Sequence, residues 1–464
     1  MDVVIIGGGP AGLSAGYELV RRGIKPVILE SGDRVGGISR TEEFKGFRFD
    51  IGGHRFYTKI EEVERIWHEV LEEAFLQVPR LSRIHYKGHF IKYPLDPLQT
   101  LSKVGAAEGA KMILSYLAAK ARPEAQEETL EQWVINRFGR RLYSTFFKSY
   151  TEKVWGVPCD QIQAEWAAQR IKGLSVRSLV SNALFGTNGS KSLIEQFNYP
   201  ALGPGMMWEA VKAVIEQAGG VVHLRTEALG LRRRGSRLVS VTAGFSGEDV
   251  ELPADYVISS APLPDLVSRL APAAPAAVLR AANELSFRAL IVVGLIVRRA
   301  EVFPDNWIYV HTPSVRVGRI QNFKNWSAAM VPEPGVTSLG MEYFCSEGDE
   351  IWAMTDRELI RLATREIAAL GLADAAEVDD ATVIRQPKAY PVYDANYRVH
   401  LQTIREFVDS LENLQTIGRN GMHRYNNQDH SMMTGLLSAR NVLGDRHDLW
   451  SVNTERSYYE DFRS

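Results

Sequence analysis

A glycine-rich run near the start of the chain has the residue types and spacing of a phosphate-binding turn. The run Gly-Gly-Gly-Pro-Ala-Gly at 7–12 follows an apolar stretch at 3–6 and precedes residues with helical periodicity. Gly7 allows a tight turn, Gly9 lets backbone N–H groups approach a diphosphate, and Gly12 lets helix and strand pack closely. The helix N-terminus adds partial positive charge at the same point. This order of strand, turn and helix predicts a dinucleotide site rather than an ordinary glycine turn.

The residues after this unit indicate which dinucleotide it holds. A second apolar strand at 26–29 ends at Glu30, whose carboxylate can accept hydrogen bonds from a ribose diol. A surface glutamate beside a glycine turn is the alternative. A second glycine pair and two arginines follow at 32–41, and this segment resembles the extended fingerprint of the flavin amine oxidase and protoporphyrinogen oxidase superfamily. That resemblance implies FAD, with cofactor contacts from Ser31, Arg34, Gly36 and Gly37.

An aromatic pair later in the chain suits the recognition of a nucleobase. Tyr150 and Trp155 precede the sequence Gly-Val-Pro at 156–158, which interrupts regular structure. Aromatic faces stack on nucleobases, so the pair predicts a base platform beside a flexible loop. Burial of both rings in a hydrophobic core is the alternative.

Two arginines from distant segments have the chemistry to bind a diphosphate. Arg170 and Arg319 could clamp its oxygens bidentately, although arginines of this kind are often solvated side chains. Arg319 and Asn325 lie in the segment 318–327, where polar and aromatic residues crowd an expected core strand. Such a local violation of the apolar pattern is typical of functional sites, and we expect Asn325 to contact the substrate.

A polar segment at 418–431 follows a buried strand at 414–417 and precedes a helix. The small residues Gly435, Ser438 and Ala439 predict that this helix packs tightly against the flavin-binding unit. Its N-terminus would direct positive potential at the flavin N1 and O2 region. The predicted cofactor-binding residues in this segment are Gly418, Arg419, Asn427, Gln428 and Ser431. His423 and His430 are expected to be structural.

These segments require an α/β fold assembled from separated parts of the chain. We expect a Rossmann-type FAD-binding domain formed by residues 1–70, 203–275 and 410–464. Residues 71–202 are predicted to form a helical insertion that includes a β-hairpin near 83–91. Strand-like patterns dominate residues 276–409, which predicts a substrate domain built on a mixed or antiparallel β-sheet.

Composition and charge exclude several classes of function. The formal net charge of −2 gives no electrostatic case for nucleic acid as the main partner. Cys159 and Cys345 are the only cysteines and lie far apart, which excludes a disulfide scaffold and fits a cytoplasmic location. No histidine pair has metal-ligand spacing, and no apolar run is long enough to span a bilayer. We therefore expect neither a metal nor a transmembrane segment.

With these segments together, the chain resembles the UDP-galactopyranose mutase family nearly end to end. The resemblance implies that Tyr150 stacks on uracil, that Trp155 lies on a mobile loop, and that Arg170 and Arg319 are catalytic residues that bind the diphosphate. Residues 52–54 resemble a glycine–histidine loop beside the flavin. Gly53 is the implied cofactor contact, and His54 is implied as a further catalytic residue. Further contacts to the sugar or diphosphate are assigned to Tyr390, Tyr393 and Tyr425.

The resemblance also implies a reaction and a cofactor state. Reduced FAD would act through N5 as a nucleophile on the anomeric carbon of a nucleotide sugar, interconverting pyranose and furanose forms without net redox change. NADPH is allowed as the reductant, although no second dinucleotide fingerprint is present. An FAD-dependent oxidoreductase of the amine oxidase or desaturase type is the alternative, and a non-catalytic flavoprotein is a third. The sequence leaves the sugar, the base and the oligomeric state open.

Overall fold

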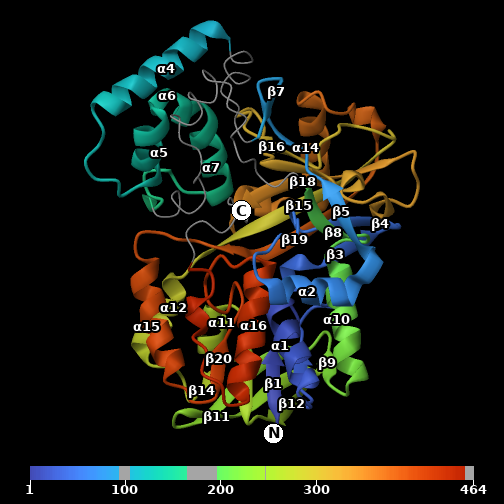
Figure 1. The fold of residues 1–464 in the computed structure, drawn as a ribbon, viewed down its shortest axis with the longest axis vertical. Coiled ribbons are helices and arrows are strands. Elements are labelled where there is room, and N and C mark those ends of the chain that lie inside the picture. The colour runs from blue at the N-terminus through green and yellow to red at the C-terminus, as the bar shows by residue number, and fades with distance from the viewer. Residues whose placement is uncertain (94–104, 165–195, 246, 455–464) are drawn as a thin grey trace.

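The computed structural model describes residues 1–93, 105–164, 196–245 and 247–454, and its first unit is built on a parallel sheet (Figure 1). The five strands run in the order β20-β13-β1-β2-β9, and every neighbouring pair is parallel. Their bounds are Leu414–Thr416, Tyr256–Ser259, Val3–Ile6, Val27–Leu29 and Val221–His223. The strands therefore come from the three separated pieces that the sequence assigns to the FAD-binding domain.

Both faces of this sheet are covered, which explains why its strands are continuously apolar. In β1, Val3 and Ile5 join one hydrophobic cluster, while Val4 and Ile6 join another. Helices α1 (Pro10–Arg21), α2 (Glu61–Leu71), α10 (Gly205–Gln217) and α16 (Gln428–Val442) contribute to the first cluster. The second face is covered by a four-stranded sheet and by helices α11 (Leu263–Ser268), α12 (Ala276–Glu284) and α15 (Tyr397–Asp409). The strands of that sheet are β12 (Glu248–Pro253), β11 (Arg237–Phe245), β10 (Glu227–Arg234) and β14 (Leu270–Ala271).

The contact between α16 and α1 is close because α16 carries small residues there. A Cβ atom on Gly435 would lie 2.2 Å from the carbonyl oxygen of Ala11. Ser438 and Ala439 are also fully buried. The expected tight packing of this helix is therefore confirmed.

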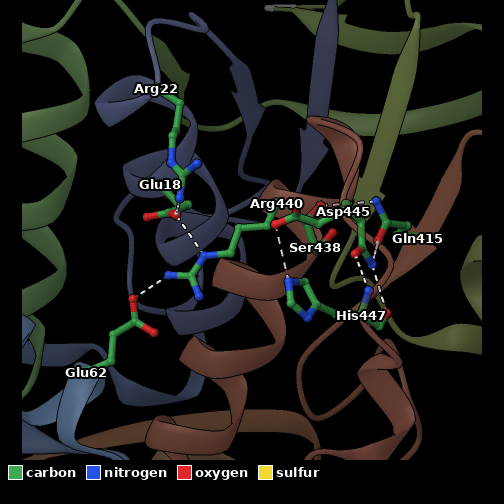
Figure 2. Close-up of polar contacts among 9 residues, drawn as sticks. Glu18, Arg22, Glu62, Gln415, Ser438, Arg440, Asp445 and His447 are labelled. Carbon is green, nitrogen blue, oxygen red and sulfur yellow. Dashed lines mark hydrogen bonds and ion pairs between the residues drawn. The ribbon is translucent and has the colours of Figure 1, made fainter.

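An ionic network fixes the same helices at their far ends (Figure 2). Arg440 of α16 donates from Nε to Glu18 of α1 at 2.9 Å and from Nη2 to Glu62 of α2. Arg22 donates to the same Glu18 oxygen at 3.0 Å. Glu18 is almost completely buried, and these two guanidinium groups offset the cost of burying its charge.

A seven-stranded mixed sheet forms the second unit, in the order β19-β15-β18-β17-β16-β6-β7. The strands span Val378–Pro391, Phe287–Val297, Thr337–Cys345, Arg319–Asn322, Trp307–Val310, Ser82–Tyr86 and His89–Lys92. Nearly every residue of β15 is buried, as befits a strand covered on both faces. Helix α14 (Asp356–Ala369) begins at a Thr355 capping box, and the short helix α13 (Glu350–Ala353) precedes it.

The predicted hairpin near 83–91 is confirmed as β6 and β7, which turn at Lys87 and Gly88. Although the sequence groups this hairpin with the helical insertion, β6 pairs in parallel with β16 and so extends the seven-stranded sheet. Two shorter antiparallel pairs complete the strands: β3 (Thr41–Phe44) with β4 (Phe47–Asp50), and β5 (Phe75–Pro79) with β8 (Gln196–Pro200).

The helical insertion lies beside the seven-stranded sheet (Figure 1). It contains α4 (Ala106–Ala121), α5 (Leu130–Phe138), α6 (Arg140–Leu142) and α7 (Lys148–Trp155), with a π-helical turn at Tyr143–Phe147. The helical pattern expected for the insertion 71–202 does not extend to its end, because Gln196–Pro200 is a strand held by pairing with β5. With this unit, the structure confirms the predicted α/β fold class with a helical insertion and a mixed sheet.

Candidate active site

A single cavity of about 1100 Å³ connects the parallel sheet, the seven-stranded sheet and α7. Its wall includes Gly7, Glu30, Ser260 and Gly418, which follow the carboxyl ends of four parallel strands. Ligands of open α/β sheets bind at this edge. The wall continues to the aromatic and basic residues Tyr150, Trp155, Arg319, Tyr390, Arg419 and Tyr425.

The glycine turn has the backbone geometry that a diphosphate requires. Gly7 has a φ of +100°, and a Cβ on it would lie 2.2 Å from Ser260 Oγ. A Cβ on Gly12 would lie 1.9 Å from the Gly7 carbonyl oxygen, so this glycine serves helix–strand packing and does not line the cavity. Gly9 faces the cavity at the N-terminus of α1, where backbone N–H groups and the helix dipole favour an anion.

The Glu30 carboxylate is held in place at the end of β2. Its Oε2 accepts from the Gly8 N–H and its Oε1 from the Gly32 N–H, both at 2.7 Å. Glu30 and the adjacent Ser31 line the cavity, so the carboxylate is fixed beside the glycine turn with acceptor capacity for a ribose hydroxyl.

The second glycine pair continues the cavity wall. Gly36 has a φ of +104° and packs against Arg40 and Trp208 without lining the cavity, whereas Gly37 lines it next to Gly9. Arg34 also lines the cavity and donates from Nη1 to the Thr41 carbonyl oxygen at 3.1 Å.

The loop at 52–54 contacts the seven-stranded sheet and α16. A Cβ on Gly53 would lie 2.9 Å from Gln321 Nε2, so this position is tightly packed. His54 Nε2 donates to the Ile51 carbonyl oxygen at 3.0 Å, and its Nδ1 accepts from Gln428 Nε2 at 3.4 Å. Burial, with the nearby charges of Arg419 and Arg319, lowers the pKa of His54 to about 4. The imidazole is therefore neutral at physiological pH.

The start of α16 provides further polar groups to the cavity. Asn427 is the N-cap residue, and Gln428 and Ser431 lie in the first turn and line the cavity. The amide oxygens of Gln428 and Asn420 are buried with no hydrogen-bond partner among the described residues. These acceptors, the glycine turn and Glu30 together form a cradle that fits a dinucleotide such as FAD.

Arg319 is fixed by a carboxylate that sequence reasoning missed. Its Nε and Nη2 approach Glu342 Oε2 at 2.7 and 2.6 Å, and Gln321 Nε2 donates to Glu342 Oε1 at 2.7 Å. Burial opposes the charge of Arg319, yet Glu342 raises the pKa of Arg319 well above its ordinary value. The guanidinium thus stays protonated in a fixed orientation, and the negative charge of Glu342 offsets part of its positive charge. A lone carboxylate in the apolar strand 337–345 is the signal that could have identified Glu342.

Rings and a second guanidinium gather near Arg319. Tyr390 and Tyr425 stack with centroids 5.8 Å apart, and Trp155 lies 6.5 and 6.4 Å from them. Arg419 lies over both tyrosine rings, 4.7 Å from the centroid of Tyr425 and 5.7 Å from that of Tyr390. It also donates to the carbonyl oxygens of Asn426 and Ala389, at 2.9 and 3.2 Å.

Tyr150 lies at the end of the cavity formed by the helical insertion. Its ring stacks on His311 with centroids 4.6 Å apart and an interplanar angle of 10°. Tyr309 meets it edge to face at 5.7 Å. Both partners line the cavity, and neither was predicted as a site residue.

Two predicted substrate contacts are not brought to the cavity, and a third lies outside the described residues. Asn325 donates its amide hydrogens to the carbonyl oxygens of Phe303 and Asp305, at 2.8 and 2.9 Å, so it supports the loop before β16 instead. Tyr393 does not line the cavity, and its hydroxyl accepts from the Tyr425 N–H at 2.6 Å. Arg170 lies outside the described residues.

In the described part of the chain, no group of three or more His, Cys, Asp or Glu side chains is arranged to hold a metal ion. None of the helices in this part of the chain has the length and apolar composition needed to cross a bilayer.

Comparisons with known proteins agree with this fold and cavity. A reduced UDP-galactopyranose mutase structure superposes with a TM-score of 0.85 over 98% of this chain and 97% of that chain, at 22% identity. A putative protoporphyrinogen oxidase from Exiguobacterium superposes with a TM-score of 0.70 at 19% identity, covering 95% of this chain and 99% of that one. At these identities the likeness shows the fold alone.

Sequence matches to curated relatives are shorter. A probable UDP-galactopyranose mutase from Klebsiella pneumoniae is 27% identical over 185 residues, which are 38% of this chain and 45% of that protein. A flavin-containing amine oxidase from Danio rerio is 35% identical over 101 residues, 21% of this chain and 19% of that protein. The matches thus span less than half the length of these relatives. Across residues 10–399, however, the sequence matches the family described as flavin containing amine oxidoreductase. The protein therefore belongs to the flavin-containing amine oxidoreductase family, which implies FAD as its cofactor.

Proposed function

We propose that this protein is an FAD-dependent nucleotide-sugar mutase that interconverts pyranose and furanose forms. One observation carries the proposal: the cavity that begins at the glycine turn ends at an oriented guanidinium among aromatic rings. Guanidinium groups match diphosphate oxygens, and aromatic faces match sugars and nucleobases. The partial sequence match to a probable UDP-galactopyranose mutase supports the same substrate class.

The chain's own residues would hold FAD along the first part of the cavity. Gly7 and Gly9 would approach its diphosphate, and Glu30 would accept from its ribose. Residues 52–54 and the first turn of α16 would border the flavin ring, with the α16 dipole favouring negative charge there. When bound in its reduced form, FAD supplies a nucleophile for exchange at the anomeric carbon.

The remaining residues would hold the nucleotide sugar. The bond between the anomeric carbon and the diphosphate breaks and re-forms, so the released diphosphate must stay in place. Arg319, oriented by Glu342, and Arg419 beside Tyr425 are placed for this, and Arg170 is proposed as a further arginine. Trp155 is buried against Tyr390 and Tyr425 and would help keep water from the reacting carbon.

The first experiment tests turnover directly. Dithionite-reduced enzyme would be incubated without oxygen with UDP-, dTDP- and GDP-hexopyranoses, and products separated by anion-exchange chromatography. We expect a furanose product from one nucleotide sugar, with no product from oxidised enzyme. Absence of product from every nucleotide sugar would reject the proposal.

A variant with a matched control tests the role of Arg319. Arg319→Lys keeps a cation for Glu342 but loses the planar donor pair, so we expect kcat/KM to fall by about 100-fold. Arg316→Ala is the control, because Arg316 is exposed, pairs with Glu350 and does not line the cavity. Equal activity of the two variants would remove Arg319 from the proposed site.

Reduction by NADPH is a separate part of the proposal, supported only by the family resemblance. Under anaerobic conditions, NADPH should bleach the flavin absorbance within the time of a steady-state assay. If only dithionite bleaches it, another reductant serves the enzyme.

An oxidoreductase of the amine oxidase type is the second candidate. The family match over residues 10–399 favours it, and so does the buried carboxylate of Glu342, which offsets the charge of Arg319 and suits a less anionic substrate. Anaerobic bleaching of oxidised enzyme by an amine, with peroxide formation in air, would establish this reaction.

A further inference from the structure

Three residues of the segment 146–153 contact His311 and its neighbours. The Phe146 carbonyl forms a hydrogen bond with the His311 ring, and the Tyr150 ring stacks on that ring. Lys153 Nζ donates to the carbonyl oxygens that flank His311, to Thr312 at 2.8 Å and to Val310 at 3.4 Å. The helical insertion is thus joined to the end of β16 at His311.

The environment keeps the His311 ring neutral. Burial and the adjacent Lys153 cation lower the pKa of His311 to about 3. Its Nδ1 is buried and has no hydrogen-bond partner among the described residues. A neutral imidazole, nearly parallel to the phenol ring, therefore covers one face of Tyr150 at all working pH values.

This arrangement restricts how Tyr150 meets a ligand. Tyr309 approaches the Tyr150 ring edge to face, and His311 occupies one of its two faces. The ring is partly accessible and lines the cavity. A ligand can therefore contact only the parts of the Tyr150 ring that Tyr309 and His311 leave uncovered. A tyrosine held in this way loses little side-chain entropy when a planar group stacks on it.

We propose that His311 is a positioning residue that holds Tyr150 in the orientation in which it stacks on the base of the nucleotide. This inference rests on the proposed nucleotide-sugar function. His311 acts through its ring face. The hydrogen bond to Phe146 holds the ring, and Lys153 holds the backbone on either side of it. It therefore contributes to base binding and leaves diphosphate binding unaffected.

Three substitutions at His311 distinguish the contribution of the imidazole ring from that of its hydrogen bond to Phe146. His311→Ala removes both, His311→Gln retains a donor for Phe146 without a ring, and His311→Phe retains a ring without a donor. His89→Ala is the control, because His89 is exposed on the β6–β7 hairpin and does not line the cavity. Dissociation constants of UDP and of inorganic pyrophosphate would be measured on each FAD-loaded variant by calorimetry, with flavin content and thermal unfolding as folding checks.

We expect His311→Ala and His311→Gln to weaken UDP binding by about three- to tenfold, the range of an aromatic pair contact, and to leave pyrophosphate binding within about twofold. His311→Phe should restore most of the UDP affinity. With a turnover assay, KM for the nucleotide sugar should rise in His311→Ala while kcat is retained.

The outcomes distinguish this inference from the proposed function. If the unmodified enzyme binds pyrophosphate but no nucleotide, the nucleotide function fails and the inference with it. If it binds UDP and His311→Ala binds UDP equally well, only the inference is overturned. Equal weakening of UDP and pyrophosphate would assign His311 a general structural role and would also overturn it.

Discussion

The pairing of Arg319 with Glu342 shows how one residue determines the charge of the cavity. Arg319 and Glu342 are directly opposite each other in the β17–β18 register, so their side chains are cross-strand neighbours. Glu342 is completely buried, and Gln321 satisfies its second oxygen. The guanidinium thus keeps its charge but points in a direction that the strand pairing sets.

Removing the Glu342 charge should destabilise the fold. Glu342→Gln leaves the Arg319 cation largely buried without its counter-charge, and we expect the free energy of unfolding to fall by about 3 kcal/mol. The midpoint of urea denaturation measures this. Glu350→Gln breaks the exposed pair with Arg316 instead and should leave the midpoint unchanged. An unchanged midpoint in Glu342→Gln would show that the ion pair adds nothing to stability.

His54 should make stability depend on pH in a defined window. Its pKa is about 4 in the folded state and 6.5 in the unfolded state, so the unfolded chain binds the proton first as pH falls. The contribution of His54 to the free energy of unfolding is retained above pH 6.5 and is lost as the pH falls from 6.5 to 4. Between pH 7 and pH 5 this loss is roughly 2 kcal/mol. Urea midpoints at both pH values should therefore converge more closely in His54→Gln than in the unmodified protein. An equal pH dependence would exclude this contribution.

At the scale of elements, the packing of α16 against α1 positions two helix N-termini at the cavity. Gly435 and the carbonyl oxygen of Ala11 are in close contact, and Gly418 packs against Ala11 Cβ at the start of the same segment. Displacing one helix would therefore displace groups proposed to bind the diphosphate and the flavin ring.

A methyl group at this contact should disturb both stability and cofactor binding. In Gly435→Ala the new Cβ would lie 2.2 Å from the Ala11 carbonyl oxygen, which the backbone can relieve only by moving. We expect a loss of about 2 kcal/mol and less FAD per purified chain, measured by thermal unfolding and flavin absorbance. Gly335→Ala is the control, because nothing lies within 4 Å of a Cβ there. Full flavin content in Gly435→Ala would separate the helix contact from cofactor binding.

At the scale of the whole molecule, contacts around the cavity join the parallel-sheet unit to the seven-stranded sheet. Arg419 donates to the carbonyl oxygen of Ala389 in β19 at 3.2 Å, and Asn420 donates to the Lys388 carbonyl oxygen of the same strand at 2.9 Å. Lys388 also pairs with Asp265 at 2.6 Å. A cofactor in the cavity would contact both sides of this junction.

FAD should therefore stabilise the two units together. Adding FAD to the apoprotein at about 100 times its Kd should stabilise the fold by about 2.7 kcal/mol. A thermal melt should show one transition whose Tm rises with FAD concentration. A second transition that is insensitive to FAD would indicate that the seven-stranded sheet unfolds independently.

Much of the fold could be predicted from local patterns. The apolar runs at 3–6, 26–29 and 414–417 correspond to β1, β2 and β20, and the hairpin near 83–91 corresponds to β6 and β7. The strand at 196–200 was mistaken for the end of a helical segment, because its partner β5 is more than a hundred residues away in sequence. Strand pairing over such a separation leaves little local signal.

The cofactor turn can be predicted from local sequence alone, because Gly7 and Gly12 occupy positions where a Cβ atom would clash with neighbouring atoms. The local sequence also sets which types of polar side chain lie near the cofactor turn. Which of these side chains meet depends on the tertiary structure. Strand register places Glu342 opposite Arg319, and the packing of α7 places Tyr150 against His311. The side-chain amide of Asn325 donates to backbone carbonyl oxygens. Local sequence encodes backbone conformation and burial, whereas the convergence of distant side chains depends on long-range packing that no local pattern contains.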